Sequence, residues 1–219
     1  MKTIVCYGDS NTWGFMPKRD MPSDWSVIRF APDVRWTGVL QRELGAQFRV
    51  EEEGLNGRTT FVDDPQDAHR NGLKYIDTCM LTKMPVDMVV LMLGTNDLKG
   101  FLGLTPLLIA RGVQSIAERI QKGGYGMRGA APEILIVAPP ALGKGIMNAW
   151  PGEEFEQQSI EKCAALPQQY AKVAAACGAR FLDASAFITA DDADCVHINE
   201  AGHAALGRRV AEIVRAIFK

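Results

Sequence analysis

Two short polar motifs, far apart in the chain, contain the residue types of nucleophilic catalysis. Ser10 follows Gly8 and Asp9 directly after an apolar run, and Asp194 stands three residues before His197. A serine hydroxyl is a weak nucleophile unless a base removes its proton and a third group orients that base. The second motif offers an imidazole and a carboxylate on one short polar segment. The sequence therefore predicts Ser10 as nucleophile, His197 as base and Asp194 as the residue that orients the base.

Acyl transfer also requires hydrogen-bond donors near the carbonyl oxygen that becomes negative in the tetrahedral intermediate. Gly57 can bring its backbone N–H close to a ligand because it has no side chain, and Gly54 in the same segment is an alternative donor. Asn96 can donate from its side-chain amide, and the Ser10 N–H is a further candidate. We therefore expect Ser10, Gly57 and Asn96 to form an oxyanion hole.

The motifs follow apolar segments that are typical of buried strands and that alternate with amphipathic helical segments. We expect strands from about Thr3 onward and at Phe48–Glu52, Met88–Leu93, Glu133–Val137 and Arg180–Asp183. We expect helices at Trp36–Leu44, Leu73–Lys83, Ile109–Lys122, Glu154–Cys177 and Glu200–Phe218. This alternation predicts a three-layer α/β/α fold with a mostly parallel five-stranded sheet, in a single domain that covers residues 1–219. In such a sheet the loops at the carboxyl ends of the strands converge, which would bring the motifs together.

Composition and charge limit the partners of the chain. Its 219 residues have a formal net charge of −2 with no basic run, so nucleic acid and anionic membranes are poorly attracted. No apolar stretch approaches the roughly 20 residues that span a bilayer, and a strand beginning near Thr3 leaves no room for a signal peptide. We therefore expect a cytoplasmic chain. Its five cysteines lack Cys-x-x-Cys spacing and are expected to be reduced.

Taken together, the motifs resemble those of the SGNH hydrolases, the GDSL lipase and esterase family. The matching residues are Gly8-Asp9-Ser10, Gly57, Gly94-Thr95-Asn96-Asp97 and Asp194-x-x-His197. The segments 33–36, 52–60 and 92–97 are similar to a bacterial arylesterase branch that includes acyltransferase and perhydrolase enzymes.

The resemblance implies a flavodoxin-like fold and an esterase that acts on short-chain aryl or acetyl esters. It assigns Ser10, His197 and Asp194 the roles given above, with Gly57 and Asn96 completing the oxyanion hole. It implies a small ester as substrate, no cofactor, acyl transfer to alcohols or peroxide as a further activity, and a homo-oligomer. A carbohydrate acetyl esterase of the same fold is the alternative.

One position departs from the family pattern, because Asn11 stands where the pattern has leucine. Since it adjoins the nucleophile, we expect Asn11 at the substrate pocket, together with Trp13 and with Trp150 from a glycine-rich segment. The proline-rich segment 15–32 carries Trp25 and Phe30, which would form a satellite core, a pocket wall or an oligomer contact.

Other interpretations of the same residues are a flavodoxin-like binding module and a different catalytic group. A binding module would hold phosphate or flavin in the loop Gly8–Gly14, but the charge of Asp9 would repel phosphate. Cys195 is a conceivable nucleophile, although a small buried filler fits its place better. Metal-assisted hydrolysis would use four side chains that can bind a cation, namely Asp9, Asp97, Asp194 and His197. Of the remaining histidines, we expect His69 to be solvated and His203 to be structural.

Overall fold

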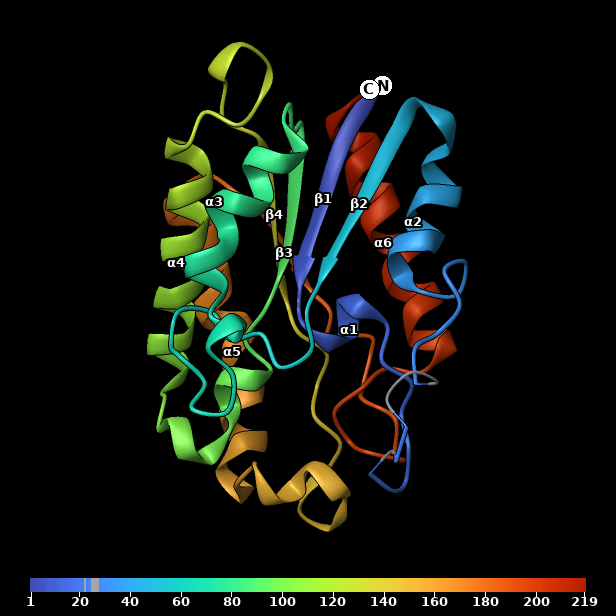
Figure 1. Ribbon diagram of the computed structural model, residues 1–219, viewed down its shortest axis with the longest axis vertical. Coiled ribbons are helices and arrows are strands. Elements are labelled where there is room, and N and C mark those ends of the chain that lie inside the picture. The colour runs from blue at the N-terminus through green and yellow to red at the C-terminus, as the bar shows by residue number, and fades with distance from the viewer. Residues whose placement is uncertain (22, 25–27) are drawn as a thin grey trace.

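The computed structural model describes residues 1–21, 23–24 and 28–219, and its strands form a parallel sheet in the order β2-β1-β3-β4-β5 (Figure 1). The strands are β1 (Lys2–Gly8), β2 (Phe48–Gly54), β3 (Met88–Met92), β4 (Glu133–Ala138) and β5 (Arg180–Asp183). The helices of more than one turn are α2 (Trp36–Leu44), α3 (Gly72–Lys83), α4 (Pro106–Lys122), α5 (Gln157–Cys177) and α6 (Glu200–Ile217). A four-residue helix, α1 (Ser10–Trp13), follows β1 directly.

Helices cover both faces of the sheet, as the alternation of strands and helices predicted. Along β1, Ile4 and Cys6 belong to the core under α2 and α6, whereas Val5 and Tyr7 belong to the core under α3, α4 and α5. Successive side chains of a strand point to opposite faces, so a strand buried on both sides is apolar throughout. The predicted three-layer α/β/α architecture is confirmed (Figure 1).

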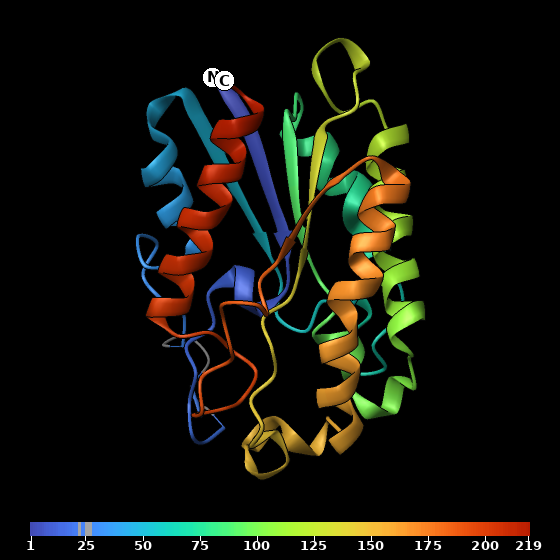
Figure 2. The same ribbon diagram turned by 180° about the vertical axis from the view of Figure 1, so that it is seen from behind.

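The carboxyl ends of the strands form the edge of the sheet at which the polar motifs gather. Figure 1 shows α1 just beyond the tip of β1, while both chain termini lie at the opposite end. In Figure 2, seen from behind, the segment between β5 and α6 runs below the strand ends toward α1. Gly8 permits the sharp turn from β1 into α1, because a Cβ there would lie 2.0 Å from Thr12 Oγ1 and 2.9 Å from Met92 O.

The ends of several helices differ from the prediction because capping residues determine them. Helix α4 starts at Pro106 instead of Ile109, since Thr105 Oγ1 accepts a hydrogen bond from Leu108 N and proline fits a first turn. Helix α5 starts three residues later than expected, at a capping box formed by Glu156 and Ser159.

Two aromatic side chains of the proline-rich segment 15–32 are packed into the interior of the protein. Phe15 and Phe30 are buried, and Phe30 meets the ring of His203 edge-on. His203 is buried as a structural residue, and its Nδ1 accepts a hydrogen bond from Trp36 N. The predicted aromatic contact of Trp25 lies outside the described residues. Within the described residues, no helix has the length and apolar character that a membrane crossing requires.

Candidate active site

The structure brings Ser10, Asp194 and His197 into one continuous hydrogen-bond chain. His197 Nε2 lies 2.9 Å from Ser10 Oγ, and His197 Nδ1 lies 2.8 Å from Asp194 Oδ2. With the proton on Nδ1, the imidazole donates to the carboxylate and accepts from the serine hydroxyl. All three residues are buried, with Asp194 fully enclosed. The geometry is the one in which a base can take the proton of a serine nucleophile.

Asp194 remains ionised in spite of its burial. Burial acts to raise its pKa, but hydrogen bonds from the His197 side chain and from the backbone N–H groups of Val196 and His197 hold the pKa below its usual value. The two N–H groups bond to Oδ1 at 3.0 and 2.9 Å, which leaves Oδ2 for the imidazole. A negative charge is therefore held where it stabilises a protonated imidazole.

Ser10 is the first residue of α1, and the turn that carries it is fixed at both ends. Asp9 caps the helix, since its Oδ1 accepts the Asn11 N–H at 3.0 Å. Gly14 ends the helix with φ of +92°, a conformation that favours glycine. This short helix was not predicted from the sequence, because four residues give no periodic pattern.

The three residues predicted to donate to a carbonyl oxygen lie around one cavity. Ser10, Gly57 and Asn96 line the same cavity, and neither the Ser10 N–H nor the Gly57 N–H bonds to another residue in the described part of the chain. Asn96 Nδ2 donates to Arg58 O at 3.1 Å, which fixes the amide and leaves its second hydrogen free. Gly57 has φ of +77°, and a Cβ there would lie 2.4 Å from Arg70 Nε. A side chain at this position would therefore be both strained and obstructed.

The cavity next to Ser10 has a volume of about 220 Å³ and an apolar wall. That wall consists of Phe15, Met21, Trp150, Pro151, Phe155 and Val196. The ring of Phe15 also stacks on the His197 imidazole, with ring centroids 4.1 Å apart. No pattern in the sequence predicts this contact, since Phe15 is one aromatic residue among several in an irregular segment.

Two of the three residues expected at the pocket lie elsewhere. Trp150 lines the cavity, and its Nε1 donates to Lys18 O. Asn11 does not line it, because the side chain is buried and bonds to the backbone of Val196 and Ile198. Trp13 is also absent from the lining and packs its ring under Arg29. In a helix, consecutive side chains point in different directions, so neighbours of a nucleophile in the sequence need not share its pocket.

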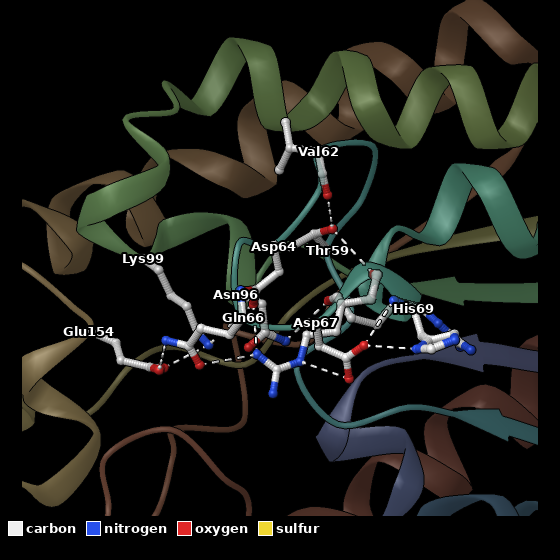
Figure 3. A network of polar contacts seen from close by, with 11 residues as sticks. Thr59, Val62, Asp64, Gln66, Asp67, His69, Asn96, Lys99 and Glu154 are labelled. Carbon is white, nitrogen blue, oxygen red and sulfur yellow. Dashed lines mark hydrogen bonds and ion pairs between the residues drawn. The ribbon is translucent and has the colours of Figure 1, made fainter.

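The other wall of the cavity is polar and held together by ionic contacts (Figure 3). Lys99 Nζ lies 2.6 Å from Glu154 Oε2, and Gln66 Nε2 donates to Glu154 Oε1 at 3.1 Å. Arg70 Nη1 donates to the buried carboxylate of Asp64 at 2.8 Å. These contacts tie three loops together and present both donors and acceptors to the cavity. None of these residues was predicted from the sequence, because single charged residues in loops carry no pattern.

Two carboxyl groups near the nucleophile are buried, namely Asp9, which caps α1 just before Ser10, and Asp97, which is close enough to Asp9 to feel its charge. Burial raises the pKa of each of them to about 6. Asp97 accepts hydrogen bonds from the Thr60 N–H and hydroxyl, whereas Asp9 Oδ2 has no partner among the described residues. Across the described chain, no three acidic, histidine or cysteine side chains gather into a group that could hold a metal ion.

The remaining candidates lie away from the serine. Cys195 is buried and does not line the cavity of Ser10, and burial raises the pKa of its thiol. His69 is exposed and contacts Asp67 on the surface (Figure 3).

Comparison with known proteins relates this chain to a group of hydrolases. The chain matches the model of the GDSL-like lipase/acylhydrolase family over residues 6–205. It is 42% identical to an aryl esterase from M. smegmatis, with 99% of each chain covered and a TM-score of 0.91. It is 32% identical to a carbohydrate acetylesterase from Sinorhizobium meliloti, with 99% of this chain and 100% of that chain covered and a TM-score of 0.88. No sequence among the curated proteins matches.

Proposed function

Because this chain belongs to the GDSL-like lipase/acylhydrolase family and is a carboxylic ester hydrolase, we propose that Ser10, His197 and Asp194 are its catalytic triad within a single domain. The observation that carries the proposal is the hydrogen-bond chain from Ser10 Oγ through the imidazole to Asp194. It ends in a cavity into which two unbonded backbone N–H groups can donate.

The reaction follows from this arrangement. Ser10 Oγ attacks the ester carbonyl carbon while His197 Nε2 takes its proton, and Asp194 stabilises the imidazolium that forms. The carbonyl oxygen becomes negative and accepts hydrogen bonds from the Ser10 N–H, the Gly57 N–H and the Asn96 amide. The imidazolium then gives its proton to the departing alcohol, which leaves an acyl group on Ser10. Water, deprotonated by the same imidazole, hydrolyses the acyl-enzyme.

The substrates that fit the cavity best are short-chain aryl or acetyl esters. A volume of about 220 Å³ accommodates a small ester, and the aromatic side chains of Phe15, Trp150 and Phe155 provide an apolar surface for it. The similarity to an aryl esterase supports this class. Acyl transfer to alcohols or peroxide, the homo-oligomer and the cytoplasmic location stay predictions.

A second candidate is an acetylated carbohydrate, and the polar wall of the cavity favours it. Gln66, Arg70, Lys99 and Glu154 offer donors and acceptors to the cavity that the aromatic side chains also line. A sugar can place its C–H face on an aromatic ring and its hydroxyl groups against such a polar surface. The similarity to a carbohydrate acetylesterase supports this candidate.

The test of the triad is Ser10→Ala, assayed on a short-chain aryl ester, with phosphonate labelling of the unaltered protein. We expect turnover to be lost in the variant and Ser10 to carry the label. Undiminished turnover, or a label on another residue, would overturn the proposal. The ratio of kcat/KM for phenyl acetate to kcat/KM for an acetylated sugar then separates the two substrate classes.

A further inference from the structure

The side chain of Asn11 bonds to the backbone of the segment that carries His197. Its Nδ2 donates to Val196 O at 3.3 Å, and its Oδ1 accepts from Ile198 N at 3.0 Å. One side-chain amide thus bonds to the residue before His197 and to the residue after it. These bonds join residues that are 185 and 187 positions apart in the sequence. They are sheltered from water, because Asn11 is 1% exposed and Ile198 is fully buried.

The segment that Asn11 contacts has a strained backbone. Cys195, two positions before His197, has φ of +61°, which is costly for a residue other than glycine. Such a conformation persists only where surrounding contacts fix it. Contacts within the segment contribute, since Asp191 N donates to His197 O at 2.8 Å. The carboxylate of Asp194 accepts the Val196 and His197 N–H groups from within the segment. From outside the segment, Gly143 N donates to Cys195 O, and the side chain of Asn11 bonds to the residues before and after the base.

Asn11 also stands next to Ser10 on the four-residue helix α1. Ser10 and the side chain that contacts the backbone around His197 are therefore consecutive residues of one short helix. A shift of α1 would carry both with it, and the 2.9 Å contact between Ser10 Oγ and His197 Nε2 would be maintained. Phe15, just after α1, adds the stacking contact on the imidazole.

We propose that Asn11 is a positioning residue that holds His197 in register with Ser10 through the backbone of Val196 and Ile198. This proposal rests on the proposed function, because holding His197 near Ser10 matters for catalysis only if the imidazole takes the proton of the serine. An amide suits this position because it carries one donor and one acceptor on a single plane. Leucine has a similar size but would leave Val196 O and Ile198 N without their side-chain partner in a buried place. Aspartate would keep the acceptor for Ile198 N and lose the donor to Val196 O.

The variants Asn11→Leu and Asn11→Asp, each made in the whole 219-residue chain, test the proposal. For Asn11→Leu we expect kcat on a short-chain aryl ester to fall by about 10- to 100-fold, because a small displacement of a catalytic group costs this much. KM should stay within about twofold, because the residue does not line the cavity. Asn11→Asp should fall between Asn11→Leu and the unaltered protein, and it replaces Asn11→Leu as the test should that variant fail to fold.

A control separates positioning from general loss of stability. Tyr125→Phe removes one side-chain hydrogen bond, from the tyrosine hydroxyl to Asp77 Oδ1, beside the amino end of β3. This end of the sheet is opposite the cavity. We expect Tyr125→Phe to lower the denaturation midpoint and to leave kcat unchanged.

A second comparison asks whether Asn11 acts through the imidazole. Introducing Asn11→Leu into a His197→Ala background should produce no further loss of the residual single-turnover rate, because the group to be positioned is gone. An unchanged kcat in Asn11→Leu overturns the proposal, and so does an equal fold-loss in both backgrounds. Wild-type turnover in His197→Ala alone would instead overturn the proposed function.

Discussion

Replacing Asp9 by Asn should stabilise the folded chain near neutral pH and leave its stability nearly unchanged in acid. Asp9 is 1% exposed, and burial raises the pKa of its carboxyl group from 3.8 to about 6. The folded state therefore disfavours the ionised form, so the free energy of unfolding falls as the pH rises from about 4 to about 6 and is level above that. The shift from 3.8 to about 6 corresponds to about 3 kcal/mol.

Asparagine avoids this cost and keeps the local structure. It has the shape of aspartate, caps helices equally well, and its Oδ1 can still accept the Asn11 N–H. The substitution also affects Asp97. Burial is the main cause of the raised pKa of Asp97, and the charge of the neighbouring Asp9 raises that pKa further. Removing the charge of Asp9 therefore lowers the cost of ionising Asp97. Both effects stabilise the variant at neutral pH, so they add in the same direction.

Urea denaturation of Asp9→Asn and of the unaltered protein at about pH 4 and about pH 7.5 measures the effect. The difference in the free energy of unfolding between the two proteins should grow by about 2.5 kcal/mol from the lower to the higher pH, because the carboxyl group of the unfolded chain is already partly ionised at about pH 4. Asp63→Asn is the control, and its effect on stability should have the opposite sign. Hydrogen bonds from Lys74 and Asn71 lower the pKa of the exposed Asp63 carboxyl, so the ionised form favours folding and its loss should destabilise the variant at the higher pH. A difference that stays constant with pH in Asp9→Asn would refute the assignment of a raised pKa to Asp9.

Two further substitutions test the cavity and the segment of the base. Asn96→Ala should lower kcat by about 10²- to 10³-fold with little change in KM, because in the proposed mechanism the amide hydrogen that is not bonded to Arg58 O donates to the oxygen that becomes negative in the intermediate; a rise in KM alone would contradict this role. Gly143→Ala should reduce kcat, since its methyl group would lie 2.7 Å from Cys195 Cβ and would push the segment that carries Asp194 and His197. In the matched Gly145→Ala the methyl group would lie 3.4 Å from Cys195 Sγ, an ordinary contact, so equal losses of kcat in the two variants would contradict the steric argument.

The sequence predicted the fold closely because the strands and helices have strong local patterns. The uninterrupted apolar run at β3 and the expected bounds of α2 and β5 agree with the structure. The starts of α4 and α5 were misplaced because they depend on single capping residues rather than on periodicity. The predicted site residues were recognisable because their types and spacing repeat a known set of motifs. The structure brings Ser10, Asp194 and His197 into contact.

The polar wall of the cavity and the raised pKa of Asp9 could not be predicted in the same way. Lys99 and Glu154 are more than fifty positions apart, and only the folded chain brings their charges together. The pKa of a carboxyl group depends on its burial, which a single residue in a short polar turn does not disclose. Both features arise from loops that meet at the carboxyl ends of the strands, where contacts are set by tertiary structure.

Asn11 shows most clearly how position in the sequence and position in space differ. Because it adjoins Ser10, it was expected to shape the substrate pocket, but its amide points to the backbone around His197. On a helix the next residue is rotated by about 100°, so the neighbour of a nucleophile faces a different part of the protein. Here that part is the segment of the base. Variation at position 11 should therefore affect the rate of proton transfer between Ser10 and His197 and have little effect on which ester the cavity accepts.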